Sequence, residues 1–150
     1  MEYQTIRFAI DADIGLTGIA LGSKGEVFVS GITPDSNLAA RTPMLARIDL
    51  DGNVIWSEPT GPAVGPMLDD ARSSHLLSVM PGSGNVCMLS RKIDEVDANA
   101  ETSTIACHDA DGGFLMGVTQ GPSTEVLSGL TVAANSDLIL VRGQKTANGI

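Results

Sequence analysis

The residues from Gly18 to Trp56 read GIALGSKGEVFVSGITPDSNLAARTPMLARIDLDGNVIW and contain two β-hairpin patterns in succession. In the first, two short apolar runs flank a Gly-containing turn at 22–26. In the second, apolar runs flank the Asp-x-Asp-Gly sequence at 49–52, where glycine can supply the positive backbone angle of a tight turn. The stretch therefore predicts four antiparallel strands.

The same pattern recurs along the chain. Asp-x-Asp-Gly at 49–52 reappears at 109–112, and Gly-Pro at 61–62 reappears at 121–122. A weaker third copy stops after its second strand, so we expect the chain to be an open piece of a larger array. The expected parts are a leading strand at 3–10, four-stranded units at about 16–60 and 75–120, and a two-stranded remnant at about 126–143.

These units resemble the seven-bladed β-propeller repeat family, and the run from Asp51 to Trp56 is also similar to quinoprotein-type propeller repeats. The residues that match the family pattern are Gly25, Val27, Gly31, Ala46, Arg47, Asp49 and Gly52 in the first unit, and Gly84, Val86, Ala106, Asp109 and Gly112 in the second. Arg91 stands where the family has glycine, and Cys107 where it has a basic residue. The resemblance implies an all-β fold, a β-propeller segment of four-stranded antiparallel blades with one leading strand and one half blade. It implies no particular activity, because propellers carry unrelated functions.

Composition limits the partners of the chain. Its 150 residues include 18 acidic and 9 basic side chains, a net charge of −9, and such a field repels nucleic acid phosphates. No apolar run has the length of a membrane span, and Met1–Gln4 lacks the layout of a signal peptide. We therefore expect no nucleic acid or membrane partner and a cytoplasmic location, or an extracellular or periplasmic one if the chain is a fragment of a longer exported protein. Aromatic residues make up only 3% of the chain, so partner contacts are expected to supply part of the burial.

The two cysteines, Cys87 and Cys107, fall on the second and third predicted strands of the second unit. Cysteines opposed across an antiparallel pair of strands can form a cross-strand bridge, which is one alternative for this pair. We expect instead two buried thiols that behave as small apolar groups, as a reducing cytoplasm favours.

Because consecutive strands run up and down, the tight turns are expected at one end of the units and the long connections at the other. The long connections are expected at 33–42, 61–74, 94–101 and 121–125, with a short helix near 67–72. These connections contain eight acidic residues, and Arg41 and Arg72 are their only bases. One of the acids is Glu125. The other seven form the candidate interaction face: Asp35, Asp69, Asp70, Asp94, Glu95, Asp97 and Glu101. Such a face suits a basic protein, a cationic ligand or calcium; the alternative is that these acids are simply solvated.

Other motifs favour structural roles. The Asp-x-Asp-Gly sequences lack the later ligands of an EF-hand loop, so turn chemistry is expected in place of calcium binding. His75 and His108 have no nucleophile-elbow partner, and the two cysteines and two histidines lack zinc-site spacing. Trp56 is expected to contribute to blade packing, with sugar stacking by Trp56 and Tyr3 as the alternative. We predict no catalytic, cofactor or metal site.

The sequence thus predicts a non-catalytic β-propeller scaffold or protein-interaction module with an acidic long-loop face. A second copy or another chain is expected to complete the propeller. Two alternatives stay open: a fragment of a propeller enzyme, either a quinoprotein-like dehydrogenase or a glycan-processing enzyme, and a sugar-binding propeller.

Overall fold

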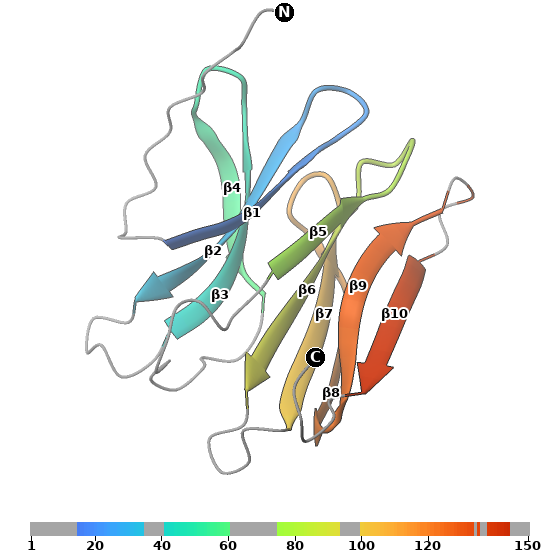
Figure 1. The fold of residues 1–150 in the computed structure, drawn as a ribbon. Coiled ribbons are helices and arrows are strands. Elements are labelled where there is room, and N and C mark those ends of the chain that lie inside the picture. The colour runs from blue at the N-terminus through green and yellow to red at the C-terminus, as the bar shows by residue number, and fades with distance from the viewer. Residues whose placement is uncertain are drawn as a thin grey trace, which may run out of the picture.

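The computed structural model describes residues 15–34, 41–60, 75–93, 100–133, 135 and 138–144. This part of the chain is all-β, as predicted, and forms three antiparallel sheets (Figure 1). The first sheet consists of β1 (Gly15–Leu21), β2 (Val27–Pro34), β3 (Arg41–Ile48) and β4 (Val54–Pro59). The second consists of β5 (His75–Val79), β6 (Val86–Ile93), β7 (Glu101–His108) and β8 (Phe114–Ser123). The third consists of β9 (Glu125–Val132) and β10 (Leu138–Gln144).

Each sheet follows chain order, since every strand pairs with the next one along the sequence. The sheets stack side by side, with β1 in contact with β5 and β5 in contact with β9 (Figure 1). The array is open among the described residues, an arrangement consistent with a segment of a β-propeller. The predicted leading strand at 3–10 and the short helix near 67–72 lie outside the described residues.

Two apolar clusters hold neighbouring sheets together, and a third covers the far side of the first sheet. Phe28 and Leu45 of the first sheet pack with Val86 of the second. Leu89 and Ile105 of the second sheet pack with Leu127 of the third. The third cluster contains Val27, Val29, Met44, Ala46 and Ile48. Because side chains alternate along a strand, it lies on the face of the first sheet turned away from the second.

The tight turns form as predicted. In the turn between β3 and β4, Asp49 Oδ1 accepts hydrogen bonds from the backbone N–H groups of Asp51 (2.9 Å) and Asn53 (2.8 Å). Asp109 Oδ1 does the same for Asp111 and Gly113 in the turn between β7 and β8. Gly52 and Gly112 have φ angles of 89° and 94°, which explains why glycine stands at both positions. The repeated acids therefore shape turns.

This geometry predicts a pH dependence of stability at Asp49. Hydrogen bonds from the Asn53 side chain and backbone lower the pKa of Asp49 below its usual value of 3.8. A lowered pKa in the folded state means that the ionised carboxylate stabilises the fold above about pH 4, and that this contribution is lost as pH falls through the folded pKa. We expect Asp49→Asn to be less stable than the parent at pH 7, with the difference shrinking below pH 3. Urea denaturation at both pH values measures this, with Asp51→Asn as the control; an Asp49→Asn deficit that is equally large at both would contradict it.

One predicted connection is absent. We expected a long segment at 121–125, but β8 continues to Ser123 and β9 begins at Glu125. The Gly-Pro pair at 121–122 does not end β8 because β8 is the outer strand of its sheet, where a missing proline N–H costs no ladder hydrogen bond. The second and third sheets are therefore joined through Thr124 alone.

Candidate functional site

The strand ends that flank the long connections lie at one end of the array, opposite the tight turns (Figure 1). Of the candidate interaction face, only Glu101 belongs to the described residues. The others lie outside them, namely Asp35, Asp69, Asp70, Asp94, Glu95 and Asp97. The structure therefore fixes the strand ends that hold these connections and leaves the acidic face itself a prediction.

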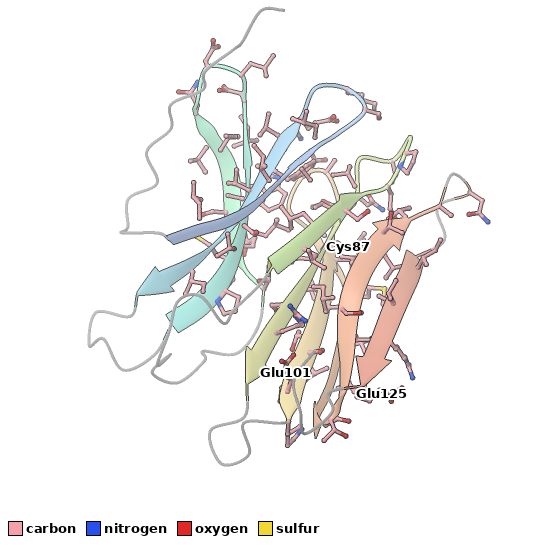
Figure 2. All side chains as sticks on the ribbon, in the orientation of Figure 1. Cys87, Glu101 and Glu125 are labelled. Carbon is pink, nitrogen blue, oxygen red and sulfur yellow. A yellow bond between two sulfur atoms is a disulfide. The ribbon has the colours of Figure 1, made fainter. Side chains whose placement is uncertain are left out.

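Glu101 differs from the expected exposed loop residue. It is the first residue of β7 and is only 7% exposed. One carboxylate oxygen lies 4.0 Å from Nη1 of Arg91 on β6. Glu125, at the start of β9, is by contrast a surface residue whose carboxylate lies 3.6 Å from Nη1 of Arg142 on β10 (Figure 2). Both acids therefore have a cationic neighbour on an adjacent strand and add little free negative charge.

The junction between the first two sheets is centred on Trp56. Its Nε1–H donates to the carbonyl oxygen of Ala110, in the turn between β7 and β8, at 2.9 Å. Nη1 of Arg47 donates to the same oxygen at 2.8 Å. The indole ring also lies 6.1 Å, centroid to centroid, from the ring of Phe28. Trp56 therefore packs between sheets, which supports the structural prediction for this residue; the donor pair on Ala110 was not predicted.

His108 takes part in the same junction and is fully enclosed. Its ring stacks on Trp56 at 6.0 Å and meets Phe114 edge-on at 5.6 Å. Nδ1–H donates to the carbonyl oxygen of Gly112 at 3.1 Å. With that nitrogen bound in the turn and the ring buried, the geometry of His108 is that of a packing residue.

Glu26 lies at the tight-turn end of this junction. Oε2 of Glu26 accepts from the backbone N–H of Lys24 at 2.9 Å. The Glu26 backbone N–H is the main cause that lowers the pKa of this carboxyl, and the positive charge of Arg47 adds to it. Gly84, at φ 76° in the second sheet, lies against the same group: a Cβ there would be 3.5 Å from Oε1 of Glu26 and 3.3 Å from Cβ of Ala110.

The cysteines form a disulfide, so the expectation of two free thiols is wrong. Cys87 and Cys107 are directly opposed on β6 and β7, with Cα atoms 4.1 Å apart (Figure 2). Both are buried against Leu127 of the third sheet. The burial expected from the sequence fits free thiols and a disulfide equally. Only the short distance between the two opposed cysteines distinguishes the disulfide from two free thiols. Disulfides persist in oxidising compartments and are rare in the cytosol. The cytoplasmic location stays a prediction.

The third sheet has an open face. The second residues of β2, β6 and β10 are Phe28, Cys87 and Ile139, at equivalent places in the repeat. Phe28 and Cys87 are completely buried in the two inter-sheet junctions, whereas Ile139 is 45% exposed. Two positions on, Val141 is 51% exposed. The sequence analysis missed this face, although aligning the apolar run at 138–141 with 27–30 would have placed both residues on the side that meets a following sheet.

A cavity of about 360 Å³ lies between β4 of the first sheet and β7 and β8 of the second. Its lining includes Thr60, Thr104, Phe114 and Val118, and none of the described residues that line it has an ionisable side chain. The described part of its wall therefore offers no general acid or base.

The described residues contain neither a cluster of metal-ligating side chains nor a membrane-spanning helix. There is no group of three or more His, Cys, Asp or Glu side chains placed to hold a metal ion among residues 15–144 as described. In the same part of the chain, no helix combines the length and apolar character that crossing a membrane requires. Comparison with known proteins returned no matching family model and no matching curated protein.

Proposed function

We propose that the chain is a non-catalytic β-propeller scaffold that binds a basic protein through its long-connection end. The observation that supports this most is the segregation of the connections: the described tight turns lie at one end of all the sheets and the flanks of the long connections lie at the other. Connections carried by a rigid sheet array are where binding residues usually lie.

Charge defines the class of partner. With Glu101 and Glu125 set aside, the segments 35–40, 61–74 and 94–99 hold six acids and a single base, Arg72. A concentration of negative charge at one end favours a cationic protein surface and speeds its approach. A second copy or another chain that covers the open sheet is the further partner in this proposal, and the cytoplasm is the proposed location.

The acidic end can be tested with poly-L-lysine as the cationic probe. Exposed ion pairs contribute about 0.5 kcal/mol each, so removing two charges should weaken binding about fivefold. We therefore expect Asp69→Asn combined with Asp70→Asn to raise the Kd about fivefold, measured by titration calorimetry, with a smaller effect at high salt because salt screens exposed charges.

The matched control removes two charges from the opposite end. Asp51 and Asp111 are exposed residues of the tight turns, and Asp51→Asn combined with Asp111→Asn changes the net charge by the same amount. This variant should bind poly-L-lysine like the parent. Equal weakening in the two double variants would show a response to net charge alone and would overturn the proposed binding end.

A further inference from the structure

The Cys87–Cys107 bond is closed to solvent. The two cysteines are 0% and 1% exposed, and both side chains project from the face of the second sheet that meets the third sheet. Because side chains alternate along a strand, the backbone of β6 and β7 lies behind the bond, and the first sheet packs on the opposite face. A molecule in solvent would therefore have to approach the two sulfur atoms from the side on which β9 lies (Figure 2).

Leucine side chains of the third sheet cover the bond. Leu127 of β9 is 4% exposed and belongs to the same apolar cluster as both cysteines. Leu130 of β9 packs against this cluster, as do Leu138 and Leu140 of β10. Both strands of the third sheet thus contribute to the cover.

The third sheet can separate from the second without breaking a strand ladder. Among the described residues, β9 and β10 pair only with each other, and β5 to β8 pair only within the second sheet. Thr124, an exposed residue, is the single link between β8 and β9. Separation removes the leucine contacts with the second sheet, whereas global unfolding also removes every ladder. A local opening of this kind requires less free energy than global unfolding.

We infer that the third sheet controls reduction of the Cys87–Cys107 bond: a dithiol reaches the sulfur atoms once the third sheet has separated, while the first two sheets stay folded. This inference goes beyond the proposed binding function and does not depend on it. In the open state, a thiolate of the reductant attacks one sulfur, forms a mixed disulfide and releases the other cysteine as a thiolate. The second thiolate of the reductant then attacks the mixed disulfide and releases the first cysteine. The reductant leaves as a cyclic disulfide, two electrons pass to the protein, and each cysteine takes up one proton.

The kinetics of reduction test this inference on the full chain. Dithiothreitol is the probe, and alkylation followed by mass measurement counts the reduced cysteines over time. We expect reduction of the folded chain to be at least about a hundredfold slower than reduction of the same chain unfolded in urea, because only the open fraction reacts. Low concentrations of urea should accelerate reduction less steeply than they promote global unfolding, since separation of one sheet exposes less surface.

Two leucine variants distinguish local separation from global unfolding. Leu127→Ala should speed reduction at least about tenfold, because the cavity it leaves weakens the cover. The matched control is Leu45→Ala, which removes a completely buried leucine from the junction between the first and second sheets. It should change the rate of reduction less than about twofold, since that junction stays closed when the third sheet separates.

Three results would overturn the inference. Equal acceleration by Leu127→Ala and Leu45→Ala would show that reduction follows global unfolding. A folded parent that is reduced as fast as the unfolded chain would show that the leucines do not exclude the dithiol. A parent that is reduced only within its urea unfolding transition would show that the third sheet does not separate by itself. If circular dichroism shows that a variant is unfolded, Leu138→Ala replaces Leu127→Ala and Val29→Ala replaces Leu45→Ala.

Discussion

Replacing Trp56 with alanine is expected to lower the free energy of unfolding by about 3 kcal/mol, the lower part of the range for tryptophan truncation, because the ring is partly exposed. Three contacts disappear together. The indole ring leaves Phe28 and His108, and its Nε1–H no longer donates to Ala110. Because these contacts join the first sheet to the second, the loss weakens the junction between sheets and not only one strand.

One further variant separates the ring from its hydrogen bond, and another serves as the control. Trp56→Phe keeps an aromatic ring and leaves the Ala110 oxygen bonded to Arg47, so it should cost only about 1 kcal/mol. Ile55→Ala removes the neighbouring apolar side chain, which is exposed, and should stay within about 0.5 kcal/mol of the parent. Urea denaturation followed by circular dichroism measures all three. A Trp56→Ala protein as stable as Ile55→Ala would show that the junction does not depend on the indole ring.

Strands and turns were predictable because their signals are local. Alternating apolar residues identify the strands, and Asp-x-Asp-Gly contains both the side chain that accepts the turn hydrogen bonds and the glycine at positive φ. The repeat near sixty residues also identified which strands share a sheet. The described part of the fold therefore follows closely from the sequence.

Features that depend on neighbouring strands were not predictable. The continuation of β8 through Pro122 requires knowing that β8 is an outer strand. Burial of Glu101 depends on where β7 begins beside Arg91. The partner of Trp56 lies 54 residues away, and no spacing rule points from one to the other. The candidate site is the least predictable part, because connections at the ends of strands carry no periodic signal.

The disulfide illustrates how the repeat modifies one position. Across β2, β3 and β4, the row facing the second sheet is Phe28, Arg47 and Trp56. The equivalent row on β6, β7 and β8 is Cys87, Cys107 and Met116, and it faces the third sheet. The first junction is thus held by rings and a hydrogen-bonded guanidinium. In the second, Cys87 and Cys107 are bonded to each other within the second sheet, and the bonded pair packs against Leu127 of the third sheet. Removing the bond should therefore affect the contact with the small third sheet.

Replacing both cysteines with alanine is expected to cost about 3 kcal/mol, the loop-closure value for a cross-link spanning some twenty residues. The two positions are 20 residues apart, and both side chains are buried, so lost packing against Leu127 adds to the effect. Urea denaturation of the parent with and without reductant provides the matched measurement. The free energy of unfolding of the parent should be about 3 kcal/mol lower when it is unfolded in reductant, whereas that of the double alanine variant should not change with reductant.

A second measurement, the count of free thiols, reports on the compartment in which the chain folds. Alkylation of the protein directly after cell lysis, followed by mass measurement, counts the free thiols. A protein folded in an oxidising compartment should have both cysteines protected, whereas a cytoplasmic protein should have both modified when unfolded, since glutathione keeps cytosolic thiols reduced. Equal stability of the parent with and without reductant would contradict a stabilising role for the Cys87–Cys107 bond. In that case the junction with the third sheet would depend on its apolar side chains, because Leu89, Ile105 and Leu127 pack there without any cross-link.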